Sequence, residues 1–212
     1  MKKRTVFVGA ILSLIPLWQP LLLKTGVVLS STGFMLYVPE KLQAQGGDFY
    51  YNRGVEKYDS GDYYGAISDY TKAIEINPRD ADAYYNRGLA KRKLEDYYGA
   101  ISDYTKAIEI NPNDSQAYLN RGVSKGKLKD YYGAISDSTN AININPQYAK
   151  AYYNRAWIKA KLEDYYGSIS DFTKAIEINP DYALGYSNRG SSKELIGDMQ
   201  GACSDWRKAS SL

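Results

Sequence analysis

Apolar and polar positions along most of this chain follow a helical period inside a unit that repeats at a fixed interval. In residues 81–114, apolar and aromatic positions recur at helical spacing over residues 82–94 and again over residues 97–110. Pro112 ends the second stretch, because the residue before a proline is pushed out of the α region. Each unit is therefore predicted to be a pair of helices joined by a short turn.

The unit occurs five times. An Asn-Arg dipeptide followed by glycine or alanine marks each copy, at Asn52, Asn86, Asn120, Asn154 and Asn188. The copies span residues 47–80, 81–114, 115–148, 149–182 and 183–212. A fixed period of this size is typical of a solenoid, in which each repeat buries its apolar face against its neighbours. We therefore expect an all-α solenoid of antiparallel helix pairs that offers an extended binding surface.

Six positions that recur in register resemble the tetratricopeptide repeat. They carry aromatic residues at positions four and 24, small residues at positions eight, 20 and 27, and proline at position 32, except for Ser138 at position 24 of the third unit and the fifth unit, which is too short to reach position 32. In the second unit these are Tyr84, Tyr104, Gly88, Ala100, Ala107 and Pro112. The resemblance covers residues 47–212 and implies a right-handed superhelix whose first helices line a concave groove. Arg87 and Lys91 stand where the family usually has leucine and tyrosine, which favours a bacterial subset with Asn-Arg-Gly or Asn-Arg-Ala.

Residues 1–44 differ in composition from the repeats. A basic start precedes residues 5–23, which carry no charge, and Ala44 provides a small residue at a possible cleavage position. This order favours a secretory signal peptide, although an uncharged stretch of this length could also stay as a membrane anchor. We expect an exported chain, periplasmic or anchored facing outside the cytoplasm, with the array over residues 45–212. If Met35 were the true start, the product would be cytoplasmic.

Composition argues against catalysis and against nucleic-acid binding. Five of the 27 basic residues and one of the 24 acidic residues lie in residues 1–44, which leaves 22 basic and 23 acidic residues in the array. A nearly neutral array has no electrostatic footprint for nucleic acid. The chain has no histidine and a single cysteine, Cys203, and its sequence shows neither a phosphate-binding loop nor a metal-ligand cluster. We expect no enzyme activity, no cofactor and no metal.

The resemblance places the groove on the first helices, with a protein or peptide as partner and the membrane reached only through the leader. The five asparagines would form a ladder of amides along a peptide backbone, unless each amide bonds within its own repeat. Aromatic residues would anchor a partner's side chain, and lysines would add a mildly basic edge or stand as ordinary solvated residues. These residues are Tyr51, Tyr85, Tyr153, Trp157, Lys93, Lys127 and Lys161.

These features favour a non-enzymatic scaffold for assembly of envelope or membrane complexes, with a membrane-tethered structural organiser as the alternative.

Three patterns concern stability. An aspartate follows each arginine of the Asn-Arg dipeptide at a constant spacing, which predicts an ion pair between helices rather than arginines free to bind an acidic ligand. Ser138 replaces an aromatic residue, which predicts a void and a weak third unit. The 22 tyrosines are expected to fill spaces between units.

Overall fold

The computed structural model describes residues 27–29, 35–37 and 40–212, with side chains from residue 46 onward. Within the predicted leader it contains two short strands, β1 (Val27–Leu29) and β2 (Met35–Tyr37), which pair antiparallel. Residues 40–44 of the predicted leader belong to a helix, and its remaining residues lie outside the described ones. Backbone contacts divide the chain into a unit that ends at residue 40 and a second unit that holds the repeats.

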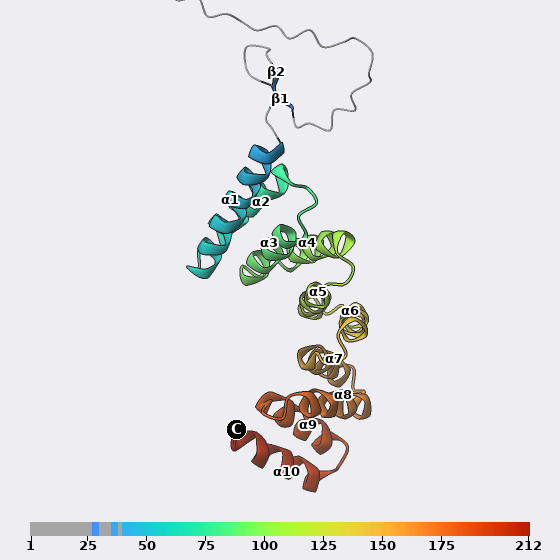
Figure 1. The fold of residues 1–212 in the computed structure, drawn as a ribbon. Helices are drawn as coiled ribbons and strands as arrows, with labels where there is room; N and C mark the ends of the chain where they lie inside the picture. Colours follow the sequence, from blue (N-terminus) through green and yellow to red (C-terminus); the bar gives the residue numbers. More distant parts are fainter. Residues whose placement is uncertain (1–26, 30–34, 38–39) are drawn as a thin grey trace, which may run out of the picture. The chain divides into compact units, whose positions relative to one another are not determined.

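The array of repeats in the structure contains ten helices, arranged as five consecutive pairs (Figure 1). The first helices of the pairs are α1 (Glu40–Asp59), α3 (Ala81–Lys93), α5 (Ser115–Lys127), α7 (Ala149–Lys161) and α9 (Ala183–Leu195). The second helices are α2 (Tyr63–Ile76), α4 (Tyr97–Ile110), α6 (Tyr131–Ile144), α8 (Tyr165–Ile178) and α10 (Met199–Ser210). The predicted all-α solenoid of helix pairs is confirmed for this part of the chain.

Helix α1 is longer than the other first helices, with 20 residues where they have 13. The extra length is at its start, because α1 begins at Glu40 and the first repeat was expected at residue 47. The predicted cleavage position after Ala44 therefore falls within a helix of the folded chain. The boundary between leader and array stays a prediction.

Local sequence sets where each second helix begins and ends. In the second unit, Asp96 is the N-cap of α4 and its carboxylate accepts a hydrogen bond from the backbone N–H of Gly99 at 2.9 Å. This bond satisfies one of the N–H groups that a helix start leaves without a partner. Asn111 is the C-cap, and Pro112 follows it. The same arrangement of aspartate and Asn-Pro delimits α2, α6 and α8.

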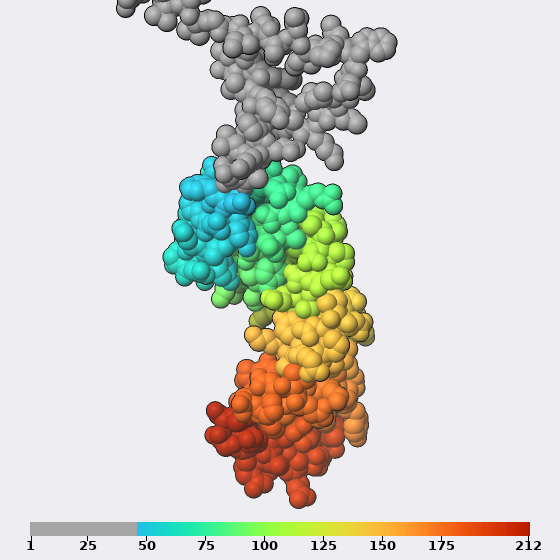
Figure 2. All heavy atoms as spheres, in the orientation of Figure 1, coloured from blue at the N-terminus to red at the C-terminus, as the bar shows by residue number. Residues whose placement is uncertain are grey.

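The first helices lie closer to one another than the second helices do. Helix α5 contacts both α3 and α7, and α7 contacts α9, whereas no two second helices of the described repeats are in contact. A stack that is shorter on one side curves toward that side, so the first helices lie on the inner face. Figure 2 shows the units following one another along an elongated body, in the order of the sequence.

The tyrosines differ widely in burial, and most of the described ones are half-buried. Tyr70 and Tyr104 are buried, with at most 1% of their surface exposed. A second set at the start of the second helices is 75–77% exposed, namely Tyr64, Tyr98, Tyr132 and Tyr166. The prediction that tyrosines fill the spaces between units is therefore wrong for these four.

Ser138 is fully buried and bonded on both sides. Its hydroxyl donates to the backbone oxygen of Ala134 at 2.9 Å and accepts from Nδ2 of Asn154, in the next unit, at 2.8 Å. The serine therefore links two units.

The small Ser138, which stands in place of an aromatic residue, is matched by a larger residue in the next unit. In the first two units, the aromatic Tyr70 belongs to the same buried cluster as the small Ala90 of the next unit. At the position of Ala90, the fourth unit carries Ile158, which is 1% exposed, opposite the small Ser138 of the third unit. By position, a large residue is thus paired with a small one at this junction as well, and we infer that Ile158 takes space left by the missing ring. The void at Ser138 stays a prediction.

Candidate functional site

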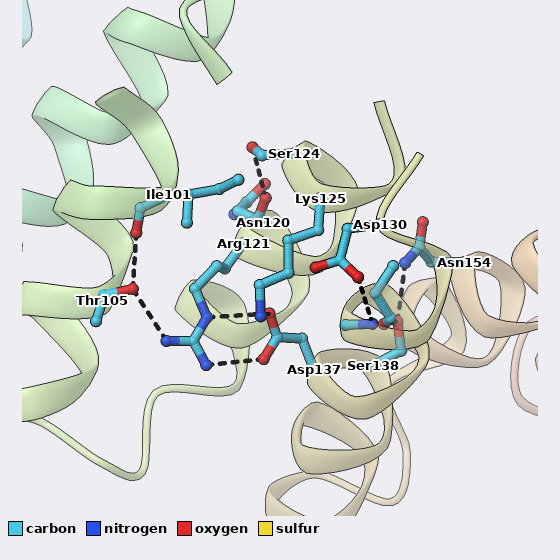
Figure 3. Close-up of polar contacts among 12 residues, drawn as sticks. Ile101, Thr105, Asn120, Arg121, Ser124, Lys125, Asp130, Asp137, Ser138 and Asn154 are labelled. Carbon is cyan, nitrogen blue, oxygen red and sulfur yellow. Dashed lines mark hydrogen bonds and ion pairs between the residues drawn. The ribbon is translucent and has the colours of Figure 1, made fainter. Parts of the chain in front are cut away.

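An ion-pair cluster joins the two helices of every unit. In the third unit, Nε and Nη2 of Arg121 donate to the two oxygens of Asp137 at 3.0 and 2.8 Å (Figure 3). Nζ of Lys125 lies 2.8 Å from the same carboxylate. Nη1 of Arg121 also donates to Oγ1 of Thr105 in the preceding unit, at 3.1 Å. The predicted Arg–Asp pair is confirmed, so these arginines are not free to bind an acidic ligand.

The cluster recurs with the same geometry in the other units. Its aspartates are 1–4% exposed although they carry charge. Their partners are Arg53 and Lys57 for Asp69, Arg87 and Lys91 for Asp103, Arg155 and Lys159 for Asp171, and Arg189 and Lys193 for Asp205. Hydrogen bonds from Arg53 lower the pKa of Asp69 to about 2, against the opposing effect of burial. The lysines and threonines of this cluster were missed in the sequence, although both recur in register with the repeat.

The groove asparagines are tied to the neighbouring unit. Nδ2 of Asn86 donates to the hydroxyl of Tyr51 at 2.9 Å and to the backbone oxygen of Asp82 at 3.0 Å. A backbone oxygen can only accept, so the nitrogen of the amide must face Asp82. Both amide hydrogens are then used, and the amide oxygen has no partner within the described part of the chain.

The same bond recurs along the inner face. Asn120 donates to Tyr85 and Asn188 donates to Tyr153, at 2.9 and 2.8 Å. In the third unit Leu119 stands in place of the tyrosine and cannot accept a hydrogen bond, so Asn154 donates to Ser138 instead. Asn52 is exposed and makes no hydrogen bond to the described residues. The sequence suggested two alternatives for these asparagines, a ladder of free amides or bonds within one repeat. Neither alternative includes the hydrogen bond from an asparagine to the preceding unit.

The tyrosine hydroxyls keep their hydrogens. Burial raises the pKa of Tyr85 to about 12 and also raises the pKa of Tyr51 and Tyr153. Each hydroxyl accepts from an asparagine and still has its own hydrogen to donate; that of Tyr85 points to Gln116 at 3.4 Å. The pairs of Asn86 with Tyr51 and of Asn188 with Tyr153 therefore each offer one acceptor and one donor to a peptide backbone, whereas the pair of Asn120 with Tyr85 offers an acceptor.

A cavity of about 320 Å³ opens between α5 and α7. Gly126 lines it, at the position where Tyr58 and Arg92 stand in the first two units. Ile158 reaches toward this glycine, and a Cβ atom at residue 126 would lie 2.9 Å from its Cδ1. The lining residues are Val123, Gly126, Lys127, Tyr153, Asn154, Trp157 and Ile158.

A second cavity of about 180 Å³ lies between α7 and α9, on the other side of Trp157. Lys161 packs against this partition, with Nζ 5.2 Å from the centroid of the indole ring. The lining residues are Trp157, Ala160, Lys161, Phe172, Asn188, Ser191, Ser192 and Leu195. Trp157 thus separates two adjacent cavities on the inner face.

The structure brings only part of the predicted groove together. Asn154, Tyr153, Trp157 and Lys127 line the first cavity, and Lys161 and Asn188 line the second. The other predicted residues lie on first helices but line neither cavity, namely Asn52, Asn86, Asn120, Tyr51, Tyr85 and Lys93. Gly126 and Ile158 were not predicted, and their departure from the repeat pattern was the signal that could have identified them.

The described residues contain no group of three or more histidine, cysteine, aspartate or glutamate side chains placed to hold a metal ion. No described helix is long and apolar enough to cross a membrane.

Family models match several stretches of the repeats. One model described as a tetratricopeptide repeat matches residues 81–114 and 149–182, and another matches residues 103–135. A third, described as a TPR repeat, matches residues 54–94. No curated protein matches the chain significantly.

Solved structures with similar folds include those of the proteins MamA and YrrB. A MamA crystal structure is 24% identical, covers 78% of this chain and 90% of its own, and gives a TM-score of 0.73. MamA from Desulfovibrio magneticus RS-1 is 22% identical over 79% of this chain and 94% of its own, with a TM-score of 0.74. YrrB, described as a TPR protein with an unusual peptide-binding site, is 22% identical over 76% of this chain and 82% of its own, with a TM-score of 0.65. At these identities the likeness shows the fold.

Proposed function

The chain belongs to the tetratricopeptide-repeat family, and we propose that it is a non-enzymatic scaffold that binds an extended segment of a partner protein along its inner face. Proteins of this family are typically interaction modules. The observation that carries the proposal is the pair of cavities on either side of Trp157. Each cavity can hold one side chain, and aromatic partitions of this kind are common anchors for a partner.

The polar groups around the cavities suit a peptide backbone. Asn154 lines the first cavity and Asn188 lines the second, and each has an amide oxygen without a partner among the described residues. Tyr153 lines the first cavity, and its hydroxyl accepts from Asn188 and keeps a hydrogen to donate. A peptide lying across Trp157 would therefore find both a donor and acceptors for its main chain.

The charge of this part of the inner face favours an acidic segment. Helices α5 and α7 contain no acidic residue. Lys127, Lys150 and Lys161 are exposed on them, and none forms an ion pair with a described residue. Complementary charge speeds association and selects between partners more than it adds affinity.

We place the partner outside the cytoplasm, in assembly of envelope or membrane complexes. The order of basic start and uncharged stretch in residues 1–44 supports this placement. If the leader is retained, the same groove would serve a membrane-tethered organiser. N-terminal sequencing of the mature protein distinguishes the two, because a cleaved chain would start near residue 45 and an anchored chain near residue 1.

The groove is tested with peptides selected from a random peptide display library against the full-length chain in mild detergent. We expect Trp157→Ala to weaken binding of the selected peptides at least tenfold, because it removes the wall that both cavities share. Tyr166→Ala is the matched control, since it removes an aromatic side chain that is 75% exposed on a second helix. Equal affinities for the wild type and Trp157→Ala would rule out this groove.

A further inference from the structure

An arginine on the inner face has no partner for its charge. Arg92 lies in the last turn of α3, one unit before the first cavity, and its side chain is half-buried. It forms no ion pair with the described residues, and its Nε is buried without a hydrogen-bond partner. The five arginines of the ion-pair clusters differ from it, because each binds an aspartate with two hydrogen bonds.

Three tyrosines lie close enough to this arginine to be affected by its charge. Tyr104 is fully buried, and its hydroxyl lies close enough to Arg92 for the guanidinium to oppose the rise of its pKa, yet makes no hydrogen bond of good geometry. Burial raises the pKa of Tyr104, Tyr85 and Tyr58, and the positive charge of Arg92 opposes the rise at all three. Arg92 therefore lies near three tyrosines, and both its Nε and the hydroxyl of Tyr104 are buried without a hydrogen-bond partner among the described residues.

A buried donor without a partner is unfavourable, and a carboxylate that binds the guanidinium removes part of that penalty. The terminal nitrogens of Arg92 are not among the buried atoms that lack a partner, and no described carboxylate accepts from them. They remain available to a ligand that lies in the groove. The planar fork of arginine suits a carboxylate, which accepts two parallel hydrogen bonds.

We propose that Arg92 binds an acidic side chain of the partner segment, next to the apolar side chain that fills the cavity at Gly126. This proposal rests on the proposed peptide groove and specifies what the groove selects. Arg92 and Gly126 hold the same place in successive units, on α3 and α5. Packed helices lie about 8–10 Å apart, and an extended chain advances about 3.3 Å per residue. The acidic residue should therefore lie about three residues from the apolar anchor.

The test uses the peptides selected on the full-length chain. We expect them to share an apolar residue and a glutamate or aspartate about three positions away. Arg92→Gln should weaken the acidic peptide about tenfold, the usual scale for a hydrogen bond to a charged group. The same peptide with its acidic residue changed to the amide should bind the wild type and Arg92→Gln within twofold of each other.

Arg79→Gln is the matched control, because Arg79 is exposed in the turn after α2 and its loss changes the net charge equally. It should leave both peptides within twofold of the wild type. Thermal melting of Arg92→Gln, together with Arg92→Lys as a charge-preserving variant, verifies that the groove stays folded. If the acidic and amide peptides lose the same affinity in Arg92→Gln, or if the selected peptides lack an acidic residue at this spacing, the carboxylate site is refuted while the groove stands. If no peptide depends on Trp157, the groove itself fails, and the site fails with it.

Discussion

Replacing Asp137 by asparagine tests whether the ion-pair cluster stabilises the array. The change keeps the size of the side chain but removes its charge and puts N–H donors near the donors of Arg121 and Lys125. Asp137 is 1% exposed and accepts two hydrogen bonds from Arg121, with Lys125 at 2.8 Å. The variant would leave two positive groups without their common partner.

The expected loss of stability follows from the burial of the three groups. Removing one partner from a buried ion pair usually costs about 3–5 kcal/mol. The side chains of Arg121 and Lys125 remain 15% and 21% exposed, so water can partly replace the carboxylate. We therefore expect a loss near the lower limit, about 3 kcal/mol.

The assay is urea unfolding followed by circular dichroism, in parallel with the variant Asp130→Asn. Asp130 caps α6 by accepting from the N–H of Gly133 at 3.0 Å, and it lies in the same unit (Figure 3). Asparagine caps a helix about as well as aspartate, so this control makes the same chemical change with an expected effect near zero. Because repeat arrays can unfold in parts, the midpoint should be compared together with the slope of the transition.

A loss below about 0.5 kcal/mol in Asp137→Asn would refute the reasoning, since surface substitutions commonly reach that value. The lysine also changes what a charge reversal should do. Exchanging Arg121 and Asp137 would place the new arginine beside Lys125, so little recovery is expected from the exchange alone. Recovery as complete as in an isolated pair would show that Lys125 is not coupled to the pair.

Two further predictions concern other parts of the array. Ser138→Tyr should lower the melting temperature, because Asn154 loses its acceptor and, on our inference, the added ring competes with Ile158 for space. Adding Ile158→Ala should recover part of the loss, and a rise in the single variant would mean that the space is empty. Acid should destabilise the first unit, because the folded pKa of Asp69 is about 2 and its ordinary value is 3.8. The contribution of Asp69 to the free energy of unfolding, roughly 2 kcal/mol, is present above about pH 4 and is lost as the pH falls toward 2. Asp69→Asn should therefore reduce the pH dependence of the free energy of unfolding, measured with urea between pH 5 and pH 2. An unchanged pH dependence would contradict the assigned pair.

The helices of the fold could be predicted because the same spacing of apolar and helix-ending residues recurs from unit to unit. Asn-Pro ends the second helix, and an aspartate starts it, as at Asn111 and Asp96. The Arg–Asp pair was predictable for the same reason, since a buried charge needs a partner and the partner recurs at a constant distance in the sequence. The links to Lys125 and Thr105 were missed because the pairing was sought only between the arginine and the aspartate, whereas the carboxylate and the guanidinium each have a further partner.

The groove was less predictable because it depends on contacts between units. When one unit is considered alone, Asn86 has the appearance of a free amide. Only the position of Tyr51 in the preceding unit shows that the amide donates a hydrogen bond to its hydroxyl. Ser138 suggests a void for the same reason, whereas its bond to Asn154 and the place of Ile158 appear only when the next unit is included. In a solenoid, each residue has to be interpreted together with its counterparts in the neighbouring units.

This division between repeated and unrepeated positions explains where selectivity can arise. Contacts that recur in every unit, such as the pair of Arg121 and Asp137, hold the two helices of a unit together and cannot distinguish one part of the groove from another. Arg92, Gly126 and Trp157 each occur once at positions that vary between units. They give neighbouring stretches of the inner face a charge, an opening and an aromatic partition. A partner segment can therefore be held in one register only where the repeat pattern is broken, and that is where both proposals place it.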